Sequence, residues 1–275
     1  MLKNTFCHLS GITPNKEQKL WGKGICSWEA LLQDESSRRG RRAQKVAEQV
    51  KMSLEYLAGN NPIYFAEQLP SSQHWRLFPE FRDSLVYLDI ETTGLGAGNS
   101  ITTIALYDGK EVFTYVQGQN LDDFVRDINK YKLIVTYNGK SFDVPFIESY
   151  FGIKLPHAHI DLRFVLKSLG YTGGLKACEK QTGISREELD GVDGYTAVLL
   201  WNEYKRNKNP KALETLLAYN ILDVLNLEKL LIIAYNQHLD ATPFNRSHKL
   251  VMPREPKNPY EPDERTLKKV LYGRF

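Results

Sequence analysis

A run of apolar residues that ends in two acids is the most informative pattern along the chain. Residues 85–95 read Leu-Val-Tyr-Leu-Asp-Ile-Glu-Thr-Thr-Gly-Leu. The apolar part is rich in β-formers and has no polar helical face, which predicts a buried central strand. Because side chains alternate along a strand, Asp89 and Glu91 project from one face, and Leu88 and Ile90 project from the other.

Two carboxylates on one face of a core strand have two explanations. They are costly to bury unless a cation lies between them, and a divalent metal is the cation that carboxylate oxygens suit. The alternative is a strand that runs out into solvent with Asp89 and Glu91 at its frayed end. The apolar run before the acids and the Thr-Thr-Gly after them favour the metal site.

The pattern after residue 100 predicts an α/β fold with a mixed sheet flanked by helices. Two β-rich segments are separated by Asp108-Gly109-Lys110, a hairpin signal, and with the first strand they predict three sequential antiparallel strands. Ser141 is expected to cap the helix that follows the next strand. The expected strands lie at 85–91, 101–107, 112–116, 133–137 and 159–162, and the expected helices at 121–130, 141–150, 175–181, 194–205 and 211–235.

Three regions are expected. Residues 1–81 predict a small helical unit, with a linker from residue 63 that contains prolines and aromatic residues. Residues 82–239 hold the α/β pattern. Residues 240–275 contain five prolines and little periodicity, which predicts an extended tail with a short helix near 266–272.

Composition narrows the class of protein. The chain has 275 residues, of which 42% are hydrophobic and 25% charged, as in an ordinary soluble domain with an appendage. No apolar run approaches membrane-spanning length. The three cysteines are widely spaced, which fits neither a disulfide framework nor a zinc site and favours a reducing cytoplasm. The middle, 81–239, has 17 basic and 20 acidic residues, whereas each flank has a net charge of +3, a mild attraction to a polyanion.

Two further acids complete a possible metal set. Asp143 is expected in the first turn of a helix that follows a core strand, and Asp223 lies on the predicted long helix. Residues four apart on a helix are neighbours, so Tyr219 shares a face with Asp223. Taken alone, each acid has an ordinary explanation, since Asp143 suits a helix N-terminus and Asp223 suits an exposed helix face.

The combination resembles a known family. Hydrophobic-Asp-x-Glu-Thr-Thr-Gly, Asn-x-x-x-Phe-Asp and Tyr-x-x-x-Asp occur in this order, which resembles the DEDD exonuclease superfamily in its tyrosine-bearing DEDDy branch. The sister branch carries histidine where this chain has Ala218. Residues 9–32 resemble a helix-hairpin-helix module, with Thr13 in place of its second glycine. This N-terminal unit and the linker at 67–79 together resemble the YprB-type bacterial members.

The resemblance implies a ribonuclease H-like fold and a 3′-5′ exonuclease that hydrolyses phosphodiester bonds at single-stranded or frayed ends of DNA or RNA by a two-metal-ion mechanism. Tyr219 would orient the attacking water. The alternative is a degenerate nuclease fold that serves as a nucleic-acid-binding or scaffolding module, against which the presence of all four acids and the tyrosine weighs. The implied ligands of two Mg²⁺ or Mn²⁺ ions are Asp89, Glu91, Asp143 and Asp223, and the implied substrate contacts are Thr92, Gly94, Leu95, Asn138 and Lys140.

Overall fold

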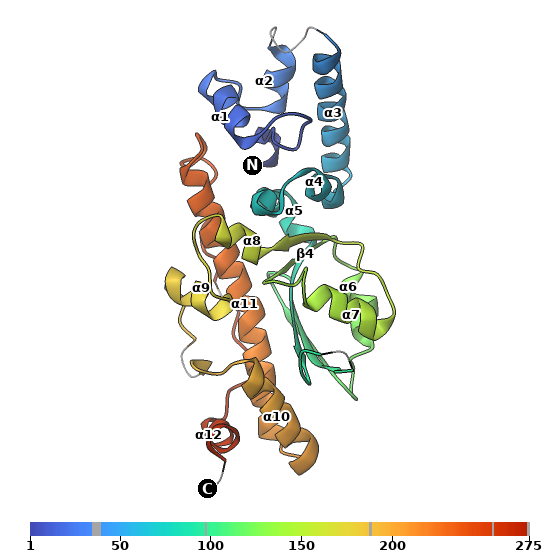
Figure 1. Cartoon of the computed structure of the whole chain (residues 1–275), viewed down its shortest axis with the longest axis vertical. Helices are drawn as coiled ribbons and strands as arrows, with labels where there is room; N and C mark the ends of the chain where they lie inside the picture. The colour runs from blue at the N-terminus through green and yellow to red at the C-terminus, as the bar shows by residue number, and fades with distance from the viewer. Residues whose placement is uncertain (35–39, 97, 187–188, 255, 274–275) are drawn as a thin grey trace.

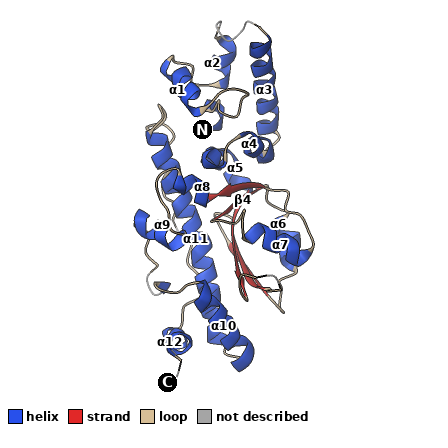
Figure 2. Cartoon of the chain, viewed as in Figure 1, coloured by secondary structure: helices blue, strands red, loops and turns tan. Residues whose placement is uncertain are grey.

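In a computed structural model of the protein, a five-stranded mixed sheet lies between two layers of helices (Figures 1 and 2). The structure describes residues 1–34, 40–96, 98–186, 189–254 and 256–273. The strands are β1 (Leu85–Thr92), β2 (Ile101–Tyr107), β3 (Val112–Val116), β4 (Leu133–Thr136) and β5 (Ala158–Asp161), in the sheet order β3-β2-β1-β4-β5. The first three strands pair antiparallel, whereas β4 and β5 run parallel to β1. This arrangement confirms the predicted α/β fold.

The helices cover both faces of the sheet. One face packs against α6 (Asp123–Ile128) and α7 (Asp143–Phe151), in a core that contains Leu88 and Ile90 of β1. The opposite face packs against α11 (Pro210–Asp240), the long orange helix of Figure 1. The remaining helices after the sheet begins are α8 (Leu162–Lys167), α9 (Leu175–Thr182), α10 (Gly194–Asn207) and α12 (Glu264–Tyr272).

Helix α11 is longer than predicted at both ends and is buried around most of its circumference. It begins where the Asn209 side chain accepts the N–H of Lys211, and Pro210 occupies the first turn, where its missing N–H has no cost. Within the described parts of the chain, no helix combines the length and hydropathy that crossing a membrane requires.

The first 84 residues are more helical than expected. The segment predicted as a linker from residue 63 instead contains α4, a 3₁₀ helix and α5. Pro62 and Pro79 lie in the first turns of α4 and α5, where a proline is tolerated, so they begin these helices rather than exclude them. The elements here are α1 (Pro14–Gly22), α2 (Trp28–Gln33), α3 (Arg41–Ala58), α4 (Pro62–Gln68) and α5 (Phe78–Phe81), with 3₁₀ helices at Leu2–Asn4, Ser71–Leu77 and Arg82–Ser84.

A buried ion pair fixes the N-terminal helices, and we call it the N-terminal pair. Arg76 Nη2 lies 2.7 Å from Glu17 Oε2, and both side chains are almost fully buried. Glu17 also accepts two backbone N–H groups, and the remaining nitrogens of Arg76 donate to Gln73 (2.9 Å) and Thr5 (3.1 Å). Each charge in this pair therefore has close partners.

The apolar core continues across the boundary expected at residue 82. One cluster joins Phe6 and Trp28 of the N-terminal helices with Tyr87 of β1 and Leu231 of α11. The division into domains stays a prediction. Near the other end, α12 begins two residues before the final helix expected at 266.

Candidate active site

Strand β1 brings two acids to the face of the sheet that α11 covers. Leu88 and Ile90 enter the core on the α7 side, so the alternation of the strand turns Asp89 and Glu91 toward α11. The pairing of β1 with β2 is regular to Glu91 and shifts register between Glu91 and Thr92. Such a bulge changes the direction of the chain where the acids end.

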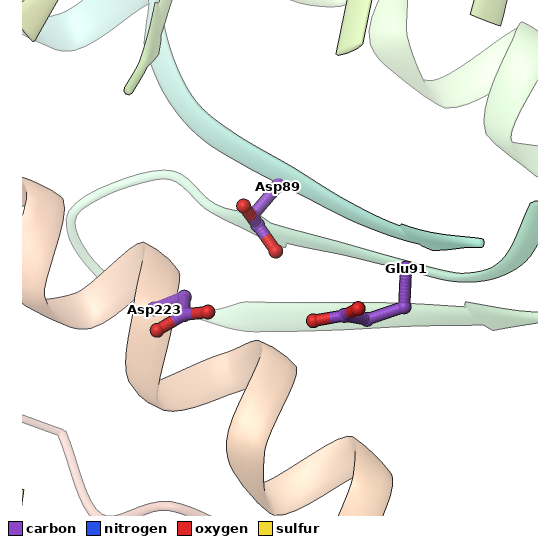
Figure 3. A group of neighbouring side chains, drawn as sticks. All are labelled: Asp89, Glu91 and Asp223. Carbon is purple, nitrogen blue, oxygen red and sulfur yellow. The ribbon is translucent and has the colours of Figure 1, made fainter. Parts of the chain in front are cut away.

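Asp223 of α11 joins these two acids from the opposite side (Figure 3). One carboxylate oxygen from each of Asp89, Glu91 and Asp223 lies within 4.8 Å of the others. We call these three residues the acid triad. Asp223 lies in the middle of α11, so packing on both sides fixes its position against the sheet.

Burial and mutual repulsion both disfavour the charged forms of the triad. The pKa of Asp89 is raised well above its ordinary value, chiefly by burial and then by the charges of Asp223, Asp143 and Glu91. Burial and the charge of Asp223 likewise raise the pKa of Glu91. A bound cation would remove this repulsion.

Asp143 lies beside the triad but is not one of its three members. It is the first residue of α7, with Phe142 at the N-cap position, so the predicted cap at Ser141 is wrong. Burial raises the pKa of Asp143 to about 7, while its own backbone N–H and that of Ile90 favour the charged form. Its charge also raises the pKa values of Asp89 and Glu91, which places it within electrostatic reach of the triad.

The donor set suits divalent ions of the hard type. Carboxylate oxygens are the preferred ligands of Mg²⁺, Mn²⁺ and Ca²⁺, and the triad offers three within a span that one ion can bridge. Buried carboxylates with raised pKa values gain most from such an ion, because the ion replaces the lost hydration.

Asn220 holds Asp89 in place, a role that the sequence did not indicate. Its Nδ2 donates to Asp89 Oδ2 at 2.7 Å, and its Oδ1 accepts the hydroxyl of Thr103 on β2 at 3.0 Å. These two hydrogen bonds join α11 to β1 and β2 of the sheet. Asn220 directly follows Tyr219, so its place in the tyrosine motif was the available signal, but the motif specifies no residue there.

A buried arginine contacts the triad and was also missed. Arg186 Nη2 donates to Asp223, and the Nε and Nη2 of Arg186 donate to Glu179 of α9 at 2.5 and 2.9 Å. Burial raises the pKa of Asp223, and Arg186 opposes that shift. Arg186 lies between the predicted helices 175–181 and 194–205 and belongs to no motif, so sequence spacing gave no signal.

Tyr219 lies one turn before Asp223 and is buried between two cations. Lys176 Nζ lies 4.9 Å and Arg186 Cζ 5.6 Å from the centroid of its ring. Burial and the charges of Asp223, Glu91 and Asp89 raise the pKa of Tyr219 far above its ordinary value. The phenol therefore stays neutral and keeps a proton to donate near the acids.

The predicted substrate contacts Thr92, Gly94 and Leu95 lie at the end of β1 and just after it. Thr92 is buried and donates its hydroxyl to the carbonyl of Gly94 at 2.8 Å. A side chain at Gly94 would place its Cβ 2.8 Å from Asn99 Oδ1, so this position admits only glycine without rearrangement. Leu95 is 86% exposed and borders a cavity of about 320 Å³, which Phe142 and Phe146 of the α7 region also line.

Asn138 and Lys140 are occupied by other contacts. The backbone N–H groups of both donate to Asp161, at 2.8 and 3.1 Å. The Asn138 side chain accepts from Arg163 at 2.6 Å, and Lys140 Nζ donates to Ser71 at 3.2 Å. Asp161 thus braces the turn before α7, and a phosphate role for Asn138 and Lys140 stays a prediction.

Comparisons with known proteins cover the region that carries the site. Residues 86–235, more than half of the chain, match the RNase H superfamily. The uncharacterized protein YprB of Bacillus subtilis (strain 168) is 30% identical over 197 residues, which are 61% of this chain and 44% of that protein. The chain therefore spans less than half the length of this relative.

Two solved structures are also similar. A family B DNA polymerase of the hyperthermophilic archaeon Pyrobaculum calidifontis has a TM-score of 0.44 and 18% identity, covering 59% of this chain and 26% of the polymerase. Brucella melitensis NrnC has a TM-score of 0.39 and 17% identity, covering 70% of this chain and 84% of NrnC.

Proposed function

The chain belongs to the RNase H superfamily, and on that premise we propose that it is a DEDDy-type 3′-5′ exonuclease that hydrolyses phosphodiester bonds of DNA or RNA. The observation that carries the proposal is the acid triad, in which the buried carboxylates of Glu91 and Asp223 and the half-buried carboxylate of Asp89 converge within 4.8 Å. Single-stranded or frayed 3′ ends are the proposed substrate, because the terminal nucleotide must reach acids that lie between a sheet and a helix.

Each predicted catalytic residue has a defined task in this proposal. Asp89, Glu91 and Asp223, with Asp143 beside them, hold two Mg²⁺ or Mn²⁺ ions. When bound, such ions stabilise the attacking and leaving oxygens of the phosphodiester and lower the pKa of a bound water. Tyr219, neutral and one helical turn before Asp223, donates a hydrogen bond that orients the attacking water.

A digest of matched DNA and RNA strands tests the activity. Strands labelled at the 5′ end are incubated with the purified protein in Mn²⁺ or in EDTA. We expect a ladder that shortens from the 3′ end in Mn²⁺ only, and the relative rates give the sugar preference. A product cut internally, or equal cleavage in EDTA, would contradict the proposal.

Replacing Tyr219 with phenylalanine tests its task separately. The ring and its packing between Lys176 and Arg186 are retained, and only the hydroxyl is lost. We expect turnover to fall by about a hundredfold, the size usual for a group that assists proton transfer. Mn²⁺ affinity measured by calorimetry should stay that of the wild type, whereas unchanged turnover would remove the tyrosine from the mechanism.

The second candidate function is a nucleic-acid-binding module with a degenerate nuclease site, and the Arg186–Asp223 contact favours it. An arginine beside an acid of the triad supplies a cation of the protein's own. Calorimetric titration with Mn²⁺ separates the two candidates, since the degenerate site should not bind divalent ions tightly.

A further inference from the structure

Arg186 is a buried arginine with an unused donor beside the acid triad. Its side chain is 4% exposed, and its Nη1 has no hydrogen-bond partner among the described residues. A buried donor that lacks an acceptor loses its hydration without compensation, so such groups are rare unless a ligand satisfies them. The missing partner must be an acceptor that reaches a site already rich in carboxylates.

Glu179 fixes the orientation of this arginine through two hydrogen bonds that do not involve Asp223. The carboxylate of Glu179 is 1% exposed and accepts from Nε and Nη2 of Arg186 in the two-pronged geometry that guanidinium groups prefer. Asn226 Nδ2 donates to the same carboxylate at 2.9 Å. Arg186 can therefore break its contact with Asp223 while its hydrogen bonds to Glu179 keep the side chain in position.

Arg186 and a divalent ion compete for the charge of Asp223. A carboxylate that already faces a guanidinium attracts a metal ion less, because the two cations repel at short range. Release of Asp223 to a metal would leave Nη2 with a vacant donor beside the unpartnered Nη1. Two adjacent N–H groups of a planar guanidinium match two oxygens of a phosphate.

Lys176 adds a second cation on the same side of the site. Its Nζ is buried, has no hydrogen-bond partner among the described residues, and lies near the Tyr219 ring. Lys176 and Arg186 also line a hollow of about 520 Å³ beside α9. Both cations therefore lie beside the triad and have N–H groups without an acceptor among the described residues.

We propose that Arg186 exchanges Asp223 for the phosphate of a nucleotide when a divalent ion binds the triad, so that metal and nucleotide bind cooperatively. This inference rests on the proposed nuclease function, since it assigns the arginine to the substrate of that site. It predicts a coupling between the two ligands that passes through one side chain.

Calorimetric titration of Mn²⁺, with and without saturating thymidine 5′-monophosphate, measures this coupling. In the wild type we expect the nucleotide to tighten Mn²⁺ binding about tenfold. In Arg186→Gln we expect Mn²⁺ to bind about tenfold more tightly without nucleotide, and the further gain on adding nucleotide to fall below about fivefold. Unchanged or weaker Mn²⁺ binding by the variant, or an unchanged gain, would overturn the proposal.

The N-terminal pair provides a matched control. Arg76 is buried to the same extent and also binds a glutamate, but it lies outside the site. Arg76→Gln should therefore keep the Mn²⁺ affinity and the nucleotide coupling of the wild type. A matching rise in Mn²⁺ affinity there would show that loss of any buried arginine suffices, and would overturn the assignment to Arg186.

Arg186→Lys keeps the experiment decisive if Arg186→Gln does not fold. The ammonium preserves the charge, so Mn²⁺ affinity without nucleotide should match that of the wild type. It cannot bind Glu179 and a phosphate together in the forked geometry, so the coupling should be lost. Wild-type coupling in this variant would refute the exchange.

The titration and the digest can fail independently. A protein that cleaves no strand but shows the expected coupling keeps the role of Arg186 and loses the exonuclease proposal. A protein that cleaves from the 3′ end but shows no coupling keeps the exonuclease proposal and reduces Arg186 to a structural brace of Asp223.

Discussion

Two buried arginines, Arg76 and Arg186, have the same exposure and the same kind of partner, yet their surroundings differ. Nε and Nη1 of Arg76 donate hydrogen bonds to Gln73 and Thr5, and Nη2 lies in an ion pair 2.7 Å from Glu17 Oε2. The other oxygen of Glu17 accepts two backbone N–H groups. Arg186 shares Nη2 between Glu179 and Asp223 and leaves Nη1 without an acceptor among the described residues.

The surroundings of the two arginines distinguish a charge that stabilises the fold from a charge that belongs to a candidate site. The N-terminal pair sets one carboxylate against one guanidinium, so nothing further is needed to neutralise it. At the site, five carboxylates face two cations, Arg186 and Lys176. The carboxylates are those of Asp89, Glu91, Asp143, Glu179 and Asp223. Burial alone therefore does not identify a site, whereas burial with an uncompensated charge does.

Substitution of Asp89 by asparagine should show the largest effect. The isosteric change removes one metal-binding charge, so we expect nuclease activity to fall at least about a thousandfold. Stability of the metal-free protein should not fall, because one of several repelling carboxylates is lost. Thermal unfolding with and without EDTA measures this, and a clear loss of stability would show that Asp89 is structural.

Glu17→Gln should give the reverse pattern. It leaves the buried Arg76 charge without its counter-ion, which costs about 3 kcal/mol in the free energy of unfolding. Urea denaturation measures that loss. The rate per folded molecule should equal that of the wild type, and a reduced rate would mean that the two regions are not independent.

Asn220→Ala should have a smaller effect on activity. Asp89 would lose the amide that holds it, and partners of metal ligands typically contribute about tenfold to metal affinity or activity. Thr103→Val, which removes only the hydroxyl behind Asn220, should have a weaker effect of the same kind. Equal effects of both variants would place the important contact at Thr103.

The smallest expected effect is on pH dependence. The pKa of Asp143 rises from near 3.8 to about 7 in the folded protein because the carboxyl is buried. Its proton is bound more tightly when folded, so metal-free stability should fall as pH rises from about 4 to about 7 and then level off. Mn²⁺ binds the deprotonated form, so the rise in melting temperature that it causes should be about 3 °C larger at pH 8 than at pH 6. An equal rise at both values would argue that Asp143 is not a ligand.

The sequence predicted what local pattern can encode. Alternation along β1 and the apolar runs of β2 and β4 specified a mixed sheet, and the spacing of Tyr219 and Asp223 specified one helix face. The linker predicted from residue 63 contains Pro79, although the first turn of a helix accepts a proline equally well.

Contacts distant in sequence could not be predicted in the same way. Arg186 and Asp223 are brought together by the packing of α9 against α11, which no periodicity records. The same holds for Thr103 and Asn220, whose hydrogen bond joins β2 to α11. The sequence therefore indicated which acids to consider, and the structure added the groups that orient or oppose them.

Helix α11 connects the acids to the opposite end of the molecule. In the C-terminal half of α11, His238 stacks on Trp75 with ring centroids 4.9 Å apart, and Glu228 pairs with Arg82 at 2.8 Å. A protein shortened at residue 82 would lose Trp75 and its contact with His238 of α11, the helix that also carries Asp223. Such a protein would keep every predicted catalytic side chain but would lose a contact that holds α11 in position against the sheet.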